Sequence, residues 1–258
     1  MANRIEKCNA FALRIVNYSD TSQIVKFFSD KFGHLDVIAK GSRNPKSPYY
    51  GALQPLAEYE IVIYKKETTL SLLKELSIIQ DSFGLIDNLE KSACAFAGGE
   101  LYLQLLFETH EYKKFYDLFK QYTAYLQRIN KNFIVIFWRF LLRILVLLGY
   151  SIQLKQCTIC KERNPKKFYG LSFVREGIIC VTCAQKNSTK NILKCSQECI
   201  DLLTSLKTIG EKLDSLQLSP SLIKEINTVL RLYLEYHLHH KIHLRSLDIY
   251  HNFNTYKT

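Results

Sequence analysis

The segment CTICKERNPKKFYGLSFVREGIICVTC, residues 157–183, restricts the fold of this chain more than any other part of the sequence. Two residues separate Cys157 from Cys160, two separate Cys180 from Cys183, and nineteen lie between the pairs. Two pairs at this spacing supply four thiolates to one tetrahedral ion, as in structural zinc sites. We therefore expect these cysteines to bind a structural Zn²⁺, because four protein ligands leave no coordination position for a substrate.

The residues between the pairs predict a short β-hairpin that carries the second pair. The stretch FYGLSFVREGIICVTC alternates in polarity, and we expect its turn at Gly177. A redox-active pair of this spacing usually occurs once and near a βαβ pattern, which is not visible in this sequence. An iron–sulfur cluster takes the same four ligands, and the sequence alone does not distinguish it from zinc.

The remaining cysteines indicate core positions rather than further ligands. The N-terminus, MANRIEKCNAFALRIVNYSD, lacks the apolar run of a signal peptide, so we expect a reducing cytoplasm in which the eight cysteines are not a disulfide framework. Cys195 and Cys199 are interpreted as small apolar side chains on two turns of a helix, with a ligand role as the alternative. Cys8 and Cys94 are interpreted as ordinary core thiols.

The positive charge of the chain is concentrated in one segment. The formal net charge is +11, and nearly all of the excess lies between residues 111 and 186. A field of this sign attracts polyanions such as nucleic acid, although a basic surface can also serve solubility alone. Hydrophobic residues make up 47% of the chain, which is enough for a packed core.

Hydrophobic periodicity predicts an α+β protein with two domains. Residues 1–80 contain five short alternating stretches, which favour a closed barrel and, as the leading candidate, an oligonucleotide-binding OB-fold. Residues 81–258 follow a helical period, with the zinc module inserted at residues 155–186. After that module we expect a helix over SQECIDLLTSLKTIGEKL, residues 196–213, and another that begins with a Ser219 cap and Pro220 at the first position. The most apolar stretch, residues 133–150, contains two arginines and is interpreted as a buried helix rather than a membrane span.

Several segments, in order, resemble the RecO family of bacterial DNA repair proteins, which are recombination mediators. The resembling segments are IVKFFSDKFGHLDVIAKGSRNPKS, LQPLAEYEIVIY, RFLLRILVLLGYSIQLKQCTIC, LSFVREGIICVTCAQ and HLRSLDIY. They extend over essentially the whole chain, and the junction of helix and first cysteine pair is the most specific of them. The chain departs from the family pattern at Leu141 and Val146, where acidic residues are common, at Asn44, where a basic residue is frequent, and at Arg245, which replaces a lysine.

The resemblance implies both an architecture and a function. It implies an N-terminal OB-fold, a helical domain and a zinc module. It further implies binding to single- and double-stranded DNA and annealing of complementary strands without nucleotide hydrolysis. The implied partners are RecR, with which RecA is loaded on DNA, and the C-terminal tail of the single-stranded-DNA-binding protein. We expect a cytoplasmic, nucleoid-associated protein that does not contact a membrane.

The loop at residues 40–50 is the first candidate for DNA contact. Single-strand binding combines cationic side chains for the phosphates with aromatic faces on which bases stack. We expect Lys40, Arg43 and Lys46 to contact phosphates and Tyr49 and Tyr50 to stack on bases. The alternative is a solvated turn whose shape is set by the two prolines of the loop.

A second basic surface is the next hypothesis. An annealing protein must hold two strands whose phosphates repel each other, so two basic surfaces serve it better than one. The candidates are the basic residues of the positive segment, and those that we assign to DNA contact are Lys113, Lys114, Lys166 and Lys167.

Two further groups of residues admit a functional interpretation. Arg139 and Arg143 are spaced i, i+4 on an apolar helix and would suit an acidic, hydrophobic partner tail, or would pair with acids inside a helical bundle. His239 and His243 would share one face of a helix and could hold a metal, although a polar helix end is the simpler interpretation.

The sequence contains no Gly-x-Ser-x-Gly, GxGxxG or paired-carboxylate motif. We therefore expect a DNA-binding mediator that is not an enzyme. The alternatives are a nucleic-acid-modifying enzyme supported by a zinc ribbon and an OB-fold protein that acts on RNA.

Overall fold

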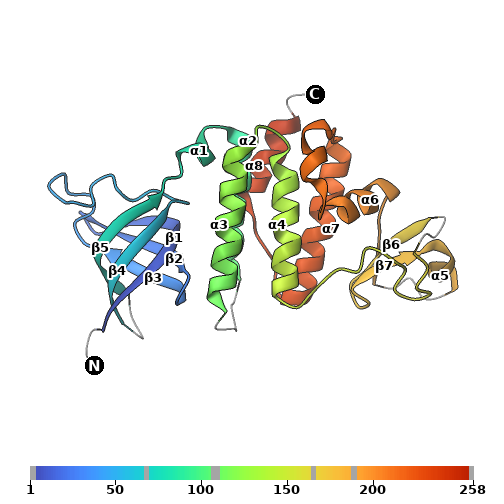
Figure 1. Cartoon of the computed structure of the whole chain (residues 1–258), viewed down its shortest axis with the longest axis horizontal. Helices are drawn as coiled ribbons and strands as arrows, with labels where there is room; N and C mark the ends of the chain where they lie inside the picture. Colours follow the sequence, from blue (N-terminus) through green and yellow to red (C-terminus); the bar gives the residue numbers. More distant parts are fainter. Residues whose placement is uncertain (1–3, 67–69, 106–110, 164–166, 187–190, 256–258) are drawn as a thin grey trace. The chain divides into compact units, whose positions relative to one another are not determined.

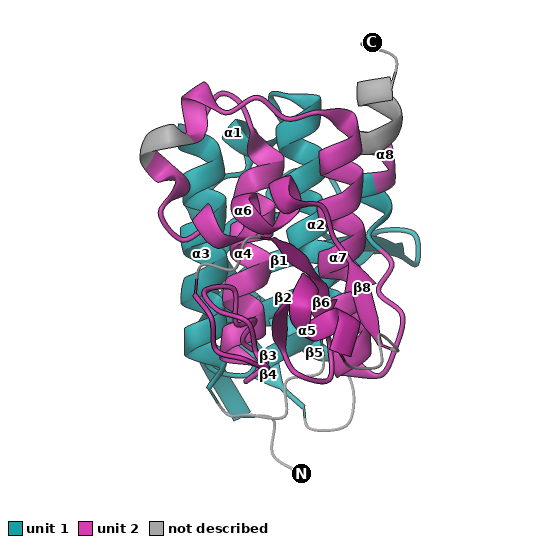
Figure 2. Cartoon of the chain, turned by 90° about the vertical axis from the view of Figure 1, so that its right-hand side faces the viewer, with its two compact units in different colours: residues 1–128, 244–247 teal, residues 129–243, 248–258 magenta. Residues whose placement is uncertain are grey.

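The computed structural model describes residues 4–66, 70–105, 111–163, 167–186 and 191–255. The chain forms two compact units (Figure 2). Unit 1 comprises Met1–Arg128 and Leu244–Leu247, and unit 2 comprises Ile129–His243 and Asp248–Thr258. Unit 1 therefore extends well beyond the strands of residues 1–80 and includes the helices that follow them.

The N-terminal part of unit 1 is a five-stranded sheet, as the alternating pattern predicted (Figure 1). The strands pair in the order β1-β2-β3-β5-β4, and β1 also pairs with β4, so the sheet closes into a barrel. All neighbours are antiparallel except β3 and β5, which run parallel. The strands are β1 (Arg4–Tyr18), β2 (Ser22–Ser29), β3 (Gly33–Ala39), β4 (Glu58–Lys65) and β5 (Ser71–Gln80).

Alternate side chains of the strands fill the interior of the barrel, because successive residues of a strand point to opposite faces. Phe27, Val37, Tyr59 and Ile61 are completely buried there, and each such side chain contributes about 1.5–3 kcal/mol through removal from water. The hydroxyl of Tyr59 also accepts a hydrogen bond from the backbone N–H of Gln54 at 2.7 Å. The barrel core thus anchors the end of the long loop between β3 and β4.

Helices α1 (Phe83–Ile86), α2 (Leu89–Gln104) and α3 (Tyr112–Arg128) complete unit 1. The ring centroids of Phe11 on β1 and Phe119 on α3 lie 4.9 Å apart. The buried carboxylate of Glu58 on β4 accepts hydrogen bonds from the Tyr116 hydroxyl and from the Lys120 ammonium group. A buried carboxylate with two donors is stable only while they stay in place, so this network ties α3 to the barrel.

One helix of unit 2 starts where a sequence signal predicted, and another ends earlier than predicted. They are α4 (Phe133–Leu147), α5 (Val181–Lys186), α6 (Gln197–Ser205), the 3-10 helix η1 (Ile209–Ser215) and α7 (Pro220–Leu238), and α8 (Arg245–Thr255) is divided between the units. The hydroxyl of Ser219 accepts from the N–H of Leu222 at 3.2 Å, and Pro220 occupies the first helical position, as predicted. The predicted helix that was to continue past Ser205 is instead a 3-10 turn.

Helix α4 is buried along most of its length, as predicted for the apolar stretch that contains it. Its Trp138 is completely buried, and the indole N–H donates to Asn227 of α7 at 2.5 Å. Among the helices that the structure describes, no helix has both the length and the apolar character that a bilayer span requires.

The hypothesis of a histidine metal site is wrong. His239 ends α7 in a left-handed conformation, with φ of 58°, and residues 240–244 are not helical. His239 and His243 therefore do not share a helix face. No histidine belongs to a group with metal-ligand proximity among the described residues.

A three-stranded sheet in the order β7-β6-β8 forms the rest of unit 2. Its strands are β6 (Phe168–Ser172), β7 (Gly177–Cys180) and β8 (Ile192–Lys194). The predicted hairpin is confirmed, but the residue with positive φ in its turn is Glu176 rather than Gly177. Gly177 is required for another reason: a Cβ atom there would lie 2.6 Å from the backbone oxygen of Gln153.

We expect Gly177→Ala to destabilise unit 2 by about 1–3 kcal/mol, because the added methyl group forces the backbone near Gln153 to move. Chemical denaturation followed by circular dichroism measures this change. Gly84→Ala is the matched control, since its Cβ would meet the side chain of Gln127 at an ordinary 3.4 Å. Equal stability of the two variants would contradict the assigned role of Gly177.

Candidate metal centre and nucleic-acid interface

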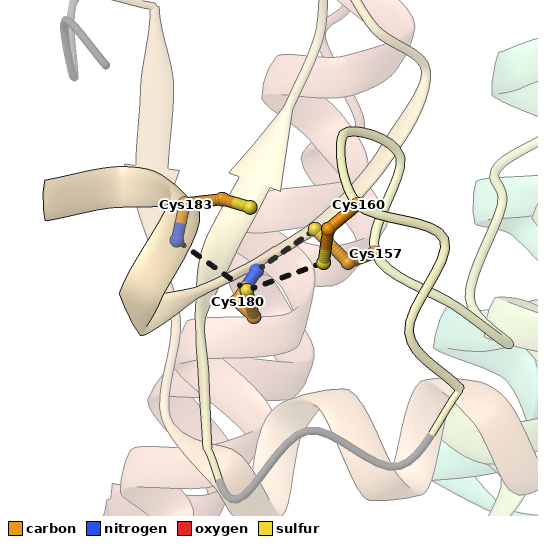
Figure 3. A group of neighbouring side chains, drawn as sticks. All are labelled: Cys157, Cys160, Cys180 and Cys183. Carbon is orange, nitrogen blue, oxygen red and sulfur yellow. Dashed lines mark hydrogen bonds between the residues drawn. The ribbon is translucent and has the colours of Figure 1, made fainter. Parts of the chain in front are cut away.

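The four cysteines of the two predicted pairs come together in unit 2 (Figure 3). Cys157 and Cys160 flank a turn, Cys180 ends β7, and Cys183 lies in α5. Their four sulfur atoms all lie within 4.8 Å of one another, and the sulfurs of Cys160 and Cys180 are 3.8 Å apart. We refer to these residues as the four-cysteine cluster.

The spacing of the sulfurs fits a single tetrahedral ion. Four sulfurs bound at about 2.3 Å to one ion lie about 3.8 Å from each other, because the tetrahedron fixes that ratio. This value matches the Cys160–Cys180 distance and is far longer than a disulfide bond. All eight cysteines of the chain are free thiols in the structure. The four-cysteine cluster is therefore able to hold a metal ion.

The backbone around the four-cysteine cluster is arranged to stabilise thiolates. The N–H of Cys180 points at the sulfur of Cys157, and the N–H of Cys183 points at the sulfur of Cys180, each at 3.4 Å. Burial raises the pKa of Cys157, but N–H groups of Cys160, Cys180 and Ile159 outweigh it and bring the pKa down to about 6. The backbone around Cys157 thus favours the thiolate, which is the form that binds a metal ion.

Burial has the opposite net effect on two other members, because it raises the pKa of Cys180 and of Cys183. Burial, together with hydrogen bonds among the sulfurs, raises the pKa of Cys183 to about 12. Ion binding must displace such protons, so metal affinity falls as the pH is lowered. Cys160 is the one exposed member of the four-cysteine cluster, whereas the other three are buried.

The loop between β3 and β4 presents three cations to solvent. Lys40, Arg43 and Lys46 are exposed, and none of them forms an ion pair with any residue that the structure describes. The N–H of Arg43 donates to the carbonyl of Thr21 at 2.8 Å, which ties the loop to the turn between β1 and β2. We call Lys40, Arg43 and Lys46 the loop cations.

The two tyrosines of this loop lie in different environments. Tyr49 packs against the barrel core, and its hydroxyl donates to the carbonyl of Lys74 at 2.5 Å. Tyr50 is 58% exposed, so its ring is accessible to a base. Stacking of either tyrosine on a base stays a prediction. The ring of Tyr50 is more exposed to solvent than that of Tyr49, which packs against the barrel core.

A cavity of about 230 Å³ adjoins one of the loop cations. Two lysines, a tyrosine and three aliphatic side chains line it: Lys40, Lys66, Tyr64, Ile38, Leu70 and Leu72. Sequence reasoning missed Tyr64 and Lys66. The available signal was their i, i+2 spacing at the end of a predicted strand, which puts two side chains on one face.

The other predicted cations differ from the loop cations in their surroundings. Lys113 forms an ion pair with Asp117, and Lys114 forms one with Glu111 at 2.5 Å. Lys167 is exposed next to β6, and Lys166 lies outside the described residues. The structure therefore brings the loop cations together on one loop, whereas Lys113 and Lys114 each already hold an acidic partner.

The two arginines of α4 lie on a partly accessible face. Arg139 is half-buried, and no described acidic residue lies within ion-pair distance of it. Arg143 is exposed. The alternative in which Arg139 pairs with an acid inside the bundle therefore finds no such acid among the described residues.

Comparison with known proteins assigns this chain to one family, with two family models that together match most of its length. The family model described as "Recombination protein O N terminal" matches residues 1–81, and that described as "Recombination protein O C terminal" matches residues 86–247. A DNA repair protein RecO from Chloroherpeton thalassium is 27% identical over 95% of this chain and 98% of its own length. The protein of the same name from Thermoanaerobacter sp. is 24% identical over 96% of this chain and 98% of its own length.

A third relative is more similar over a shorter segment. The DNA repair protein RecO from Salinibacter ruber is 43% identical over 91 residues, which are 34% of this chain and 35% of that protein. The full-length matches and the local match bear the same name.

Proposed function

Because this chain belongs to the RecO family of DNA repair proteins, we propose that it is a DNA-binding mediator of recombinational repair. In this proposal it binds single- and double-stranded DNA and anneals complementary strands without catalysing a chemical reaction. With RecR, it helps to load RecA on strands coated by the single-stranded-DNA-binding protein. The names of the relatives support a role in DNA repair. The positive charges of this chain support the proposed binding and annealing of DNA strands.

The observation that carries the proposal is the group of exposed loop cations, none of which forms an ion pair with a residue that the structure describes. A cation without an acidic partner can pair with a phosphate and release counterions without first losing another interaction. Lys40 also lines the cavity that contains Tyr64 and Lys66, so cationic and aromatic groups lie side by side, as single-strand binding requires. We propose that the barrel is an OB-fold and that the strand follows the loop cations past this cavity.

Lys113, Lys114 and Lys167 are proposed as secondary contacts. Lys113 and Lys114 would exchange a carboxylate for a phosphate, and exposed ion pairs of this kind contribute only about 0.2–1 kcal/mol. Their contribution to affinity is therefore smaller than that of the loop cations. Lys166, also predicted as a contact, stays a prediction from the sequence.

We propose that the four-cysteine cluster holds Zn²⁺ in a structural role. The close approach of the sulfurs suits one ion, whereas an iron–sulfur cluster has several metal atoms to enclose. The ion, when bound, supplies electrostatic cross-linking between the turn at Cys157–Cys160 and the end of β7. The chain's own part is to direct backbone N–H groups at the sulfurs.

The DNA-binding part of the proposal is tested by titration of the full chain against labelled oligonucleotides over a range of salt concentrations. We expect tight binding to single-stranded DNA at low salt, with log affinity falling at about 0.7 per phosphate contact for each unit of log salt. Stronger binding to structured RNA would favour an RNA-binding protein instead. Turnover of a nucleic-acid substrate in the same samples would favour a modifying enzyme.

Arg139 and Arg143 are proposed to receive the acidic, hydrophobic tail of the single-stranded-DNA-binding protein. Two observations support this assignment: no acidic residue in the described part of the chain forms an ion pair with Arg139, and Arg143 is exposed. We expect Arg143→Glu to weaken binding of a tail peptide at least about tenfold, which corresponds to about 1.4 kcal/mol, as measured by calorimetry. Arg128→Glu is the matched control, since it reverses one exposed arginine on α3. Equal losses in both variants would leave only a general charge effect and would refute the assignment.

A further inference from the structure

A second group of metal-ligating side chains lies in unit 2, outside the four-cysteine cluster. The sulfurs of Cys195 and Cys199 and a carboxylate oxygen of Glu225 all lie within 4.8 Å of one another. The sequence interpretation treated the two cysteines as apolar side chains of one helix. Glu225, thirty residues away on another helix, gave no signal that it would face them.

Three different segments of unit 2 supply these side chains. Cys195 directly follows β8 and precedes the first helical residue of α6 by two positions, so it is not on the helix. Cys199 lies in the first turn of α6, and Glu225 lies in α7. Ligands from a strand end and two helices converge on one point, as they do where an ion cross-links elements.

Ser196 fixes the carboxylate in its orientation. Its backbone N–H and its hydroxyl donate to the two oxygens of Glu225, each at 2.6 Å. The same hydroxyl accepts from the N–H of Cys199 at 3.1 Å and so caps α6. Each carboxylate oxygen retains a free lone pair, because it accepts only one of these bonds. Hydrogen bonds of this kind, from a residue adjacent to the ligands, are typical of metal sites.

Burial distinguishes this arrangement from ordinary core packing. Cys199 is completely buried and Cys195 is 7% exposed, whereas Glu225 is only half-buried. Buried thiols that merely fill space would be expected to lie among apolar groups, but here an oxygen of the carboxylate that Ser196 orients lies within 4.8 Å of both sulfurs.

We propose that Cys195, Cys199 and Glu225 form a second site for a zinc-class divalent ion. Two thiolates and one carboxylate are three of the four ligands that such an ion takes, and water completes the set. Fewer sulfurs and an open position make this site weaker and more exchangeable than the four-cysteine cluster. Its ion links β8 and α6 to α7, and thus the small sheet to the helices of unit 2. This inference does not depend on DNA binding.

Cobalt(II) titration of the full chain tests the second site. The reduced protein is first given one equivalent of Zn²⁺ for the four-cysteine cluster and is then titrated with Co²⁺ without oxygen. We expect one further ion to bind and to produce a sulfur-to-cobalt charge-transfer band. The double variant Cys195→Ser with Cys199→Ser should lose both the uptake and the band. The matched control Cys8→Ala with Cys94→Ala, which removes two other buried thiols, should retain them.

Glu225→Gln should keep both sulfurs but weaken Co²⁺ binding at least about tenfold, because the charged ligand is lost. Unchanged affinity in this variant, or an unchanged band in the double variant, would overturn the proposal. If a variant fails to fold, cadmium-113 NMR of the unmodified chain tests the second site without any substitution. We expect two resonances, one from four sulfurs and one from two, whereas a single resonance would leave only the four-cysteine cluster.

Discussion

Cys160→Ser is expected to abolish tight Zn²⁺ binding and to unfold the module at residues 155–186. Structural zinc sites in small peptides bind with about 10–16 kcal/mol, and this binding energy is also their folding energy. Cys160 is exposed, so a serine there would change stability by no more than about 0.5 kcal/mol if the thiol had no ligand role. The two interpretations therefore predict very different outcomes for one substitution.

Metal content after dialysis against a chelator and limited proteolysis of the full chain measure this effect. We expect the original chain to keep its ion and to resist cleavage between Cys157 and Cys183, and the variant to lose the ion and be cleaved there. Cys8→Ala is the control, since it removes a thiol from the barrel and should leave the metal content unchanged. A Cys160→Ser protein that keeps its ion and its resistance would show that Cys160 is not a ligand.

Removal of the three loop cations is expected to have the second large effect. In the variant Lys40→Ala, Arg43→Ala and Lys46→Ala, affinity for single-stranded DNA should fall by on the order of tenfold or more at low salt. The slope of log affinity against log salt should become shallower by about 2, since each phosphate contact accounts for about 0.7. Fluorescence anisotropy with a labelled oligonucleotide gives both quantities.

The barrel offers a control with the same loss of charge. Lys7, Lys26 and Lys31 are paired with Glu60, Asp36 and Glu6 at 2.8, 2.7 and 2.6 Å. Their replacement by alanine removes three positive charges whose fields are already compensated nearby. We expect this control to change the salt slope little. If both triple variants lost affinity equally, net charge rather than the loop would govern binding.

The fold was predictable from the sequence wherever local signals agreed with each other. Strict alternation predicted the five strands, and Ser219 with Pro220 predicted the start of α7. The spacing of the cysteine pairs predicted their convergence, because a pair separated by two residues acts as one short bidentate element. These signals lie within a few residues of each other and do not depend on the rest of the chain.

Features that depend on distant contacts were not predictable. The break at His239 requires a left-handed residue without a glycine, and no local pattern marked it. The packing of α3 against the barrel rests on Glu58, Tyr116 and Lys120, which are far apart in the sequence. The approach of Glu225 to Cys195 has the same origin. Single-sequence periodicity reports which face is buried but not which partner covers it.

The sequence showed which residues of the candidate interface are basic, but it did not show which of them have an acidic partner. All the predicted lysines looked alike in the sequence, and the structure separates Lys113 and Lys114, which have acidic partners, from the loop cations, which have none among the described residues. The i, i+4 spacing of Lys113 and Asp117 was an available signal. Net charge by segment therefore overestimates how many cations are free for a polyanion.

The most direct test of the account is annealing of complementary oligonucleotides by the full chain, without ATP, on bare strands and on strands coated by the single-stranded-DNA-binding protein. We predict that the chain accelerates annealing on both, and that the loop-cation variant is slower while the control with Lys7, Lys26 and Lys31 replaced is not. A folded, metal-loaded chain that leaves the annealing rate unchanged at low salt would contradict the account.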